Sequence, residues 1–185
     1  CRSEQVAMLI PLIDTDLLLL SHNRQRFADI GTTAIISDPA LVEIALNKYK
    51  THDFFVSCGI DTPQVFDMQK ARSDTSLPYP LFMKPLDGNA SKGIVKIRNQ
   101  TELCFFQQYV PQPLLQEYVE GTEYTLDLFY DFSGIARCVV PRKRIEVRSG
   151  EVSKAVIIKH PVVLEHGWRV AQALKGCRGC INVQC

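Results

Sequence analysis

The sequence lacks a strong net charge and a long uninterrupted apolar run. With 21 Lys and Arg against 20 Asp and Glu over 185 residues, its formal net charge is +1, so no overall field attracts nucleic acid or an acidic membrane surface. The longest apolar run, residues 6–20, is interrupted by Pro11, Asp14 and Asp16. A membrane-spanning helix needs about 18 uninterrupted apolar residues. These absences predict a protein that binds neither nucleic acid nor a membrane.

Cysteine is present without the pattern of a disulfide scaffold or a metal site. Seven cysteines, an odd number in a large chain, are typical of a reducing compartment, so we expect a cytoplasmic protein. The C-x-x-C at Cys177 and Cys180 has no second pair, which a structural zinc site with four ligands needs. The four histidines share no ligand spacing. We therefore expect reduced thiols and surface or core histidines.

Two common phosphate-binding motifs are also absent. The spacing from Gly88 to Gly93 imitates the start of a P-loop, but Ile94 stands where that motif has lysine, and a strand rather than a helix is expected to follow. No G-x-G-x-x-G occurs, which excludes the dinucleotide-binding fingerprint.

What is present is a globular composition, 46% hydrophobic and 22% charged, with alternating strand and helix patterns that indicate an α/β fold. We expect Gly176 to cap the last helix at its C-terminus and Trp168 to lie in that helix's core. Strands are expected at 6–13, 32–37, 79–84, 94–97, 114–121, 123–131, 135–147, 154–160 and 181–185. Helices are expected at 14–31 with an acidic cap, 39–50, 51–59, 99–110 and 161–176.

The stretch YPLFMKPLDGNASKGIVKI, residues 79–97, combines an apolar strand ending in Lys84 with a loop of small residues. Lysine is rarely buried unless it is paired, and the backbone N–H groups of such a loop can approach an anion closely. An ordinary long hairpin with Lys84 at its rim explains this stretch equally well. Both interpretations stay open on this stretch alone.

Other residues favour a phosphate ligand. Lys48 is expected at the end of a helix, and two acids, Glu117 and Glu123, flank a turn downstream. Together with Lys84 they supply cations for phosphates, a main-chain edge for a purine and a carboxylate for ribose hydroxyls. Within PRKRIEVR, strand alternation places Arg142 and Arg144 on one face and Lys143 on the other.

Six segments together resemble the ATP-grasp superfamily, in particular its carbamoyl-phosphate-synthase-like branch. They cover nearly the whole chain in the family's order, so their combination is specific although each piece alone is weak. The segments are LIPLIDTDLLLLSHNRQRF, NKYKTHDFFVSCGIDTP, YPLFMKPLDGNASKGI, LLQEYVEGTEYTLDLFYD, RKRIEVRSGE and GCRGCINVQC. The resemblance implies an ATP-grasp fold, an α+β sandwich within the broad α/β class. It implies the end of a Rossmann-like preATP-grasp domain at 1–37, an N-terminal ATP-grasp subdomain at 38–113 and a C-terminal one at 114–185.

The resemblance also implies roles for single residues. Lys48, where Asn47 replaces the family's usual aspartate, and Lys84 would hold the phosphates of ATP. Glu123 would bind the ribose hydroxyls, and Gln184 would bind Mg²⁺ or Mn²⁺. The phosphate loop would comprise Gly88, Asn89, Ala90, Ser91 and Gly93. The hinge that reads adenine would comprise Glu117, Tyr118 and Val119. Arg142 and Arg144 would face the γ-phosphate or the acyl substrate.

One departure qualifies this resemblance. The family continues into a strand that carries a metal-binding glutamate and asparagine, whereas this sequence ends at Cys185. We therefore expect the metal site to be a fragment and the chain alone to be inactive. The strand expected at 181–185 would then be left at an open sheet edge, which favours association and allows a homodimer.

Three functions remain open from the sequence. The first is an ATP-dependent ligase that joins a small carboxylate to an amine or ammonia through an acyl phosphate. Such chemistry needs positioning and charge neutralisation rather than a nucleophilic side chain, and no Ser/His/Asp or Cys/His set stands out. The second is an ATP-binding module or pseudoenzyme without turnover. The third is an α/β interaction domain without a nucleotide.

Overall fold

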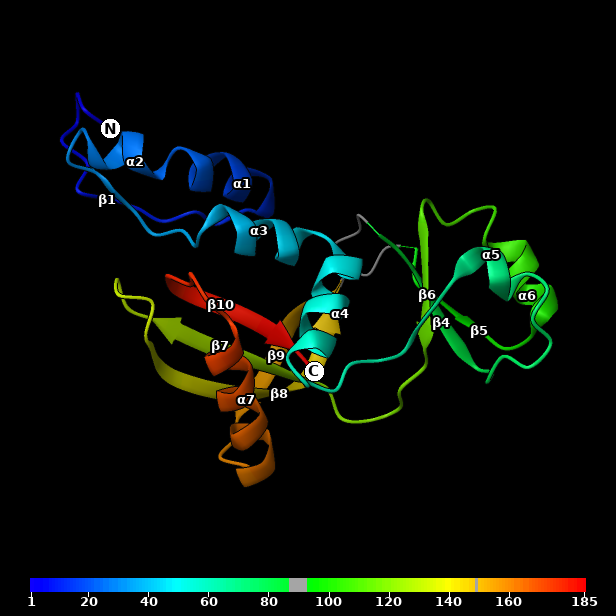
Figure 1. Cartoon of the computed structure of the whole chain (residues 1–185). Helices are drawn as coiled ribbons and strands as arrows, with labels where there is room; N and C mark the ends of the chain where they lie inside the picture. Colours follow the sequence, from blue (N-terminus) through cyan, green and yellow to red (C-terminus); the bar gives the residue numbers. More distant parts are fainter. Residues whose placement is uncertain (87–92, 149) are drawn as a thin grey trace. The chain divides into compact units, whose positions relative to one another are not determined.

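The computed structural model describes residues 1–86, 93–148 and 150–185 (Figure 1). The helices are α1 (Asp14–His22), α2 (Arg24–Ala28), α3 (Pro39–Leu46), α4 (Lys48–Ser57), α5 (Met68–Ala71), α6 (Gln100–Phe106) and α7 (Pro161–Ala173). The strands are β1 (Met8–Leu9), β2 (Thr33–Ala34), β3 (Val65–Phe66), β4 (Leu81–Pro85), β5 (Val95–Ile97), β6 (Pro113–Glu117), β7 (Tyr124–Tyr130), β8 (Ala136–Arg148), β9 (Glu151–Ile157) and β10 (Gly179–Gln184).

The chain divides into two compact units, which we describe separately. The terminal unit comprises residues 1–46, 123–143 and 156–185, and the central unit comprises 47–122 and 144–155. The domain boundaries suggested by the sequence, after residues 37 and 113, remain a prediction.

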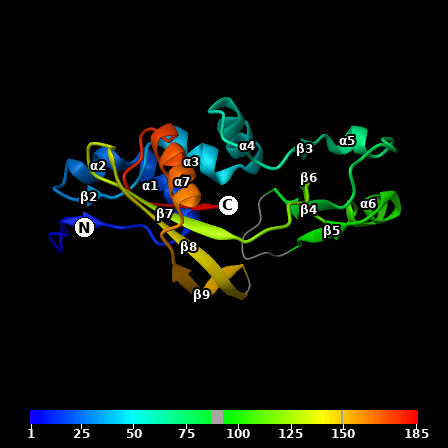
Figure 2. The ribbon, with the colours of Figure 1, turned by 90° about the horizontal axis from the view of Figure 1, so that it is seen from below.

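The terminal unit contains a parallel β1–β2 pair and most of an antiparallel sheet of order β10-β7-β8-β9. Helix α7 covers one face of that sheet (Figure 2). The Tyr130 hydroxyl donates to the Ala171 carbonyl at 2.9 Å. At Gly167 a Cβ atom would lie 2.6 Å from Val139 Cγ1, so only glycine allows this close approach of helix to strand. Because residues alternate along β7, the face that carries Asp127 points away from α7.

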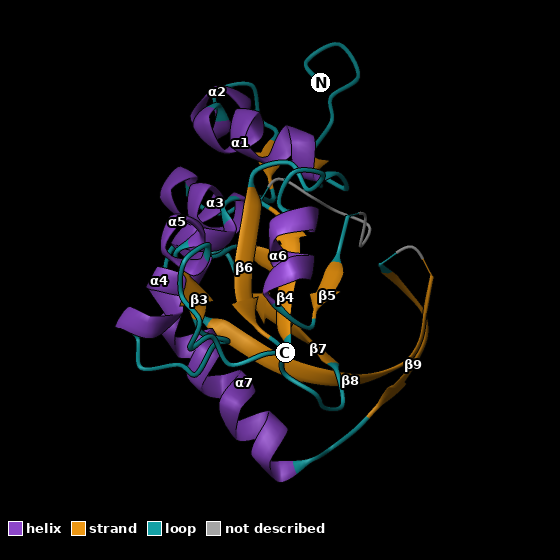
Figure 3. Ribbon diagram, turned by 90° about the vertical axis from the view of Figure 1, so that its right-hand side faces the viewer, coloured by secondary structure: helices purple, strands orange, loops and turns teal. Residues whose placement is uncertain are grey.

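The central unit is built on an antiparallel sheet of order β3-β6-β4-β5. Figure 3 shows α6 lying over this sheet, and its Leu103 packs with Leu81, Met83 and Leu115 in a core of fully buried side chains. Burial alternates along β4, so Leu81 and Met83 point into the core while Phe82 and Lys84 are only partly buried. The predicted strand ending near Lys84 is confirmed, and this alternation turns the lysine toward the other face of the sheet.

The mixed fold class is as the sequence predicted, and the two four-stranded sheets are antiparallel where their pairing is described. The helix predicted at 14–31 is wrong as a single element. It divides into α1 and α2 at Asn23, which lies outside the helical region at φ −102° and ψ 9°. The acidic cap is also wrong, because Ile13 occupies the N-cap position and no side chain caps the helix. The acids of the first turn, Asp14 and Asp16, instead lie at the positive end of the helix dipole, where a negative charge stabilises the helix.

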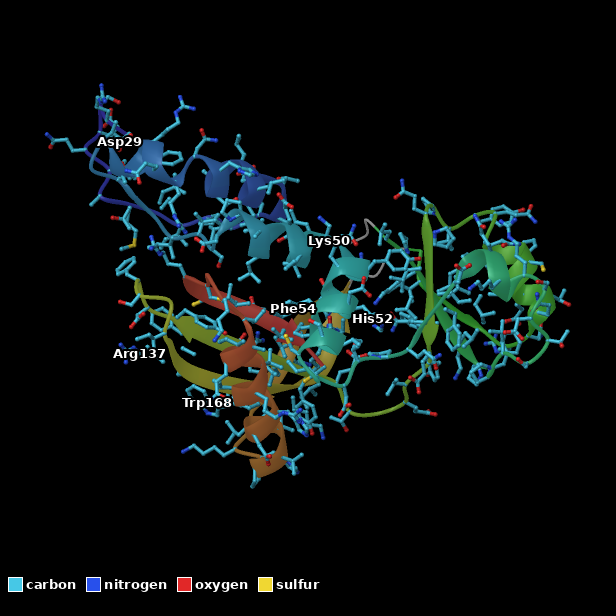
Figure 4. All side chains as sticks on the ribbon, viewed as in Figure 1. Asp29, Lys50, His52, Phe54, Arg137 and Trp168 are labelled. Carbon is cyan, nitrogen blue, oxygen red and sulfur yellow. The ribbon has the colours of Figure 1, made fainter. Side chains whose placement is uncertain are left out.

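Two expectations about α7 are corrected. Gly176 is not its C-cap: the helix ends at Ala173, and Leu174 is extended at ψ 126°. Gly176 instead forms a turn at φ +72°, where a Cβ atom would lie 2.5 Å from an oxygen of Asp38. Trp168 is 37% exposed rather than buried in the helix core, and Figure 4 shows it on α7. Among the described residues, no helix has the length and apolar character needed to cross a membrane.

Candidate functional site

Asn47 sets the position of the first candidate lysine in the central unit. Its backbone is extended, and its side-chain oxygen accepts hydrogen bonds from the N–H groups of Tyr49 at 3.0 Å and Lys50 at 3.1 Å. Asparagine is among the best N-cap residues, so one helix stops before it and α4 starts after it. The expectation that Lys48 ends a helix is therefore wrong, because Lys48 is the first residue of α4.

The two candidate lysines lie in one electrostatic neighbourhood. The Lys48 ammonium donates to the carbonyl oxygen of Leu86, just beyond the end of β4. Burial, and secondarily the positive charge of Lys48, lowers the pKa of Lys84. Two cations that disfavour each other's charge create a place where an anion is stabilised. The structure thus brings together the two lysines that the sequence singled out.

Only one member of the predicted phosphate loop can be placed. Gly88, Asn89, Ala90 and Ser91 lie outside the described residues. Gly93 has φ +71°, and a Cβ atom there would lie 3.0 Å from Pro85 Cγ. Both the backbone conformation and the close contact require glycine at this end of the loop.

The predicted hinge begins at the last residue of β6, Glu117. Its N–H donates to the Gln64 carbonyl at 2.8 Å, and its carboxylate accepts from the Gln64 N–H at 3.2 Å. The next residue, Tyr118, has the Lys96 ammonium 3.7 Å from its ring centroid. Its ring also lies 6.4 Å from that of Phe82. The Glu117 backbone and the Tyr118 ring are therefore held in place, while the following Val119 is 61% exposed.

In the terminal unit, the predicted ribose and metal residues lie side by side. The Gln184 side-chain NH₂ donates to a Glu123 carboxylate oxygen at 3.4 Å. Their strands are joined beside them, because Tyr124 and Cys185 exchange two backbone hydrogen bonds of 2.7 and 3.0 Å. The amide oxygen of Gln184 and the Glu123 carboxylate are oxygen ligands of the kind that Mg²⁺ prefers.

Arg142 belongs to a second polar cluster on the same sheet. Its Nε donates to Asp127 Oδ2, and its Nη2 donates to Asp127 Oδ1 at 2.8 Å. The side-chain NH₂ of Asn182 also donates to Asp127 Oδ1. The hydrogen bond that Arg142 donates to Asp127, together with the negative charge of that carboxylate, raises the pKa of Arg142. A bidentate bond of this kind fixes the plane of the guanidinium group as well as its position.

The site predicted from the sequence does not include Asp127 and Asn182, although the alternation of side chains along a strand could have indicated them. Asp127 is four residues after Glu123, and Asn182 is two residues before Gln184, so each lies on the same strand face as a predicted site residue. The register pairs Asp127 directly with Asn182. We add both residues to the candidate site.

Arg144 belongs to the central unit, whereas Arg142 belongs to the terminal unit. The Nη2 of Arg144 donates to the Gly150 carbonyl at 3.1 Å. The shared role predicted for Arg142 and Arg144 remains a prediction.

The remaining candidate groups contribute little chemistry. Cys177 is buried, which raises the pKa of its thiol to about 11, so it is protonated near neutral pH. In the described part of the chain, no three His, Cys, Asp or Glu side chains form a cluster that could hold a metal. His52, which Figure 4 shows on α4, has a buried Nδ1 without a hydrogen-bond partner.

A magnesium ion fits the terminal unit only in part. Mg²⁺ takes one or two carboxylates together with substrate phosphates. Glu123 and Gln184 supply one carboxylate and one amide oxygen. These donors are of the right type, and phosphate oxygens would have to complete the coordination.

Comparison with protein families gives a match over most of the chain. The sequence profile described as the ATP-grasp domain matches residues 45–184. A D-alanine–D-alanine ligase from Pseudomonas putida is 29% identical over 91 residues, covering 45% of this chain and 29% of that protein. A carbamoyl-phosphate synthase from Methanobrevibacter smithii is 22% identical over 131 residues, covering 68% of this chain and 36% of that protein.

Solved structures share the fold at low sequence identity. The biotin carboxylase domain of the Hydrogenobacter thermophilus 2-oxoglutarate carboxylase, a dimer in complex with MgADP, ADP and bicarbonate, superposes with a TM-score of 0.76 at 18% identity. The match covers 98% of this chain and 45% of the biotin carboxylase chain. Biotin carboxylase from Campylobacter jejuni, in a complex with beta-gamma-ATP, has a TM-score of 0.72 at 14% identity, and the match covers 98% of this chain and 46% of that chain. The chain thus spans about a third of the curated relatives named above and less than half of these structures.

Proposed function

We propose a function from one premise: this chain belongs to the ATP-grasp family. We infer that it binds ATP and forms part of a ligase that joins a small carboxylate to an amine or ammonia through an acyl phosphate. The family's relatives include ligases that the chain resembles in sequence. The particular carboxylate and amine are left for experiment.

One observation carries the proposal, the paired lysines of the central unit. Lys84 is half-buried beside Lys48, and both burial and that second charge oppose its protonation. Such an arrangement costs stability in the free protein. A triphosphate would supply the missing negative charge, with Lys48 at the first turn of α4, where the helix dipole also favours an anion.

Other residues would bind the remaining parts of the nucleotide. In the central unit, the backbone of Tyr118 and Val119 would read adenine, while the loop containing Gly88 and Gly93 would cover the phosphates. In the terminal unit, the Glu123 carboxylate would accept hydrogen bonds from the ribose hydroxyls, because an ionised acid is a strong acceptor. Arg142 would meet the γ-phosphate.

The proposed reaction balances in two steps. A carboxylate oxygen of the substrate attacks the γ-phosphorus of ATP, and the bond to the β–γ bridging oxygen breaks, giving an acyl phosphate and ADP. The amine nitrogen then attacks the acyl carbon, loses a proton and expels inorganic phosphate. Lys84 and Arg142 would neutralise the phosphoryl oxygens throughout. A bound Mg²⁺, held by Gln184 and phosphate oxygens with the support of Glu123, would supply further charge neutralisation.

A second function is ATP binding without turnover. The observation that favours it is the incomplete set of metal ligands. In the described part of the chain, Gln184, the predicted metal residue, contacts the carboxylate of Glu123, and no three His, Cys, Asp or Glu side chains form a metal-binding group. Such a module would bind ATP through the same lysines and release it unchanged.

Single-turnover ADP formation separates these functions. We would mix radiolabelled ATP and Mg²⁺ with the 185-residue chain and with the longest natural protein that contains it, adding amino acids as carboxylate and amine. The ligase proposal predicts that the longer protein forms ADP only when a carboxylate is added. Hydroxylamine should trap the acyl phosphate as a hydroxamate, and both products should be lost in Lys84→Met. ATP binding without ADP in the longer protein would support the non-catalytic module instead.

A further inference from the structure

The carboxylate of Asp127 lies at the centre of three adjacent strands. Asp127 is on β7, Arg142 is on β8 and Asn182 is on β10, and these strands run side by side (Figure 1). Asp127 Oδ1 accepts from Arg142 Nη2 and from the Asn182 NH₂, while its Oδ2 accepts from Arg142 Nε. One side chain therefore holds groups from both neighbouring strands.

The bonding pattern determines what Asp127 can do. A carboxylate offers about four acceptor positions, and three are occupied by these donors. With three of these positions engaged, the carboxylate acts through its hydrogen bonds rather than as a general base. Its side chain is 31% exposed and that of Arg142 is 30% exposed, so the cluster lies at the sheet surface rather than in the core.

We propose that Asp127 is a positioning residue that holds Arg142 and Asn182 for contact with the γ-phosphate of ATP. This inference rests on the proposed function. With Nε and one Nη2 hydrogen bound to Asp127, the guanidinium group keeps both Nη1 hydrogens and the other Nη2 hydrogen as donors in a fixed plane. Asn182 keeps the second hydrogen of its side-chain NH₂ as a donor. Preorganised donors of this kind need no rearrangement when the phosphate arrives.

The same pattern occurs beside it on β10. The NH₂ of Gln184 bonds to Glu123 as the NH₂ of Asn182 bonds to Asp127. Asp127 of β7 and Glu123, the residue just before β7, thus each accept a hydrogen bond from a carboxamide of β10. The repetition supports a functional arrangement, since cross-strand packing alone does not require polar pairs on an open sheet face.

The hairpin supplies a matched control. Asp131 and Arg137 form another Asp–Arg pair between the end of β7 and β8, with Arg137 Nη2 2.6 Å from Asp131 Oδ2. Asp131 also accepts from the backbone N–H groups of Ser133 and Ile135 in the turn. That pair therefore supports the hairpin, and its loss should affect stability without selecting between nucleotides.

The test is the ratio of the dissociation constants for ADP and ATP, measured by calorimetry with Mg²⁺ on the 185-residue chain. Asp127→Asn should lower the preference for ATP about tenfold, as expected for losing a charge-assisted contact, and leave ADP binding unchanged. Arg142→Gln should do the same, and the double variant should lose no more than either alone. Asp131→Asn should leave the ratio unchanged.

Different failures point to different conclusions. If the unsubstituted chain binds ATP and Asp127→Asn leaves the ratio unchanged, or weakens ATP and ADP equally, the role of Asp127 is overturned. Additive losses in the double variant would also overturn it. If the unsubstituted chain binds neither nucleotide, the proposed function itself fails. Arg142→Gln keeps the test informative should Asp127→Asn not fold.

Discussion

Replacing Lys84 by methionine should weaken ATP binding and stabilise the free protein at the same time. Methionine keeps much of the lysine's apolar stem and removes the charge. In the folded chain that charge is opposed first by burial and then by Lys48, which together lower its pKa. A positive charge held in this way is expected where an anionic ligand compensates it.

The loss of binding can be sized from charged hydrogen bonds, which contribute roughly 1.5–3 kcal/mol. Lys84→Met should therefore raise the dissociation constant for ATP by about 10-fold to 150-fold. The gain in stability follows from linkage. A lysine whose folded pKa lies below its unfolded value makes the fold less stable as pH falls from the unfolded to the folded pKa, and the full cost remains below the folded pKa. Lys84→Met does not carry this cost, so near neutral pH its free energy of unfolding should be higher than that of the unsubstituted chain. The difference disappears above the unfolded pKa of the lysine.

Calorimetry with MgATP and urea denaturation at pH 7.5 measure both effects, with Lys70→Met as the control. Lys70 is an exposed lysine of α5 in the same unit, and surface substitutions change stability by about 0.5 kcal/mol or less. A Lys84→Met chain that binds ATP normally would remove Lys84 from the site. One that unfolds more easily than the unsubstituted chain would refute the electrostatic reasoning.

Three further predictions concern the other candidate residues. Glu123→Gln should weaken ATP severalfold but spare a nucleotide without ribose hydroxyls in calorimetry; equal losses would contradict the ribose role. Asn47→Ala should lower the free energy of unfolding by about 1 kcal/mol in urea denaturation, because the helix cap is lost. Asn47→Asp should keep or exceed the original stability, because a negative charge favours the start of α4. Unchanged stability in Asn47→Ala would show that the cap does not stabilise the fold. Because the pKa of Lys84 is lowered and phosphates favour its charged form, ATP binding in alkaline solution should take up protons. Titrations at alkaline pH in buffers of different ionisation enthalpy would show no uptake if Lys84 does not meet phosphate.

Local pattern was sufficient to predict individual strands of the central sheet. Alternating burial in residues 81–85 follows from a period of two, which puts Leu81 and Met83 in the core and turns Lys84 to the other face. The β7–β8 hairpin was predictable from its apolar strands and the glycine at its tip. Gly134 takes φ +76° there, a conformation that glycine adopts without strain.

Helix boundaries and long-range pairs were harder to predict. Residues on both sides of Asn47 favour a helix, and only the capping bonds to Tyr49 and Lys50 show that α4 begins there. Asp127 meets Asn182 because β7 and β10 pair in one register, although 55 residues separate them in the chain. A strand pattern gives the face of each residue but not its partner across the sheet.

The most direct test of the central claim is a titration of the 185-residue chain with MgATP in a calorimeter. We predict one binding site per chain, tighter for ATP than for ADP and weakened about tenfold or more by Lys84→Met. ATP binding that is unchanged by Lys84→Met, or no binding by the folded chain, would contradict an ATP site built on the paired lysines.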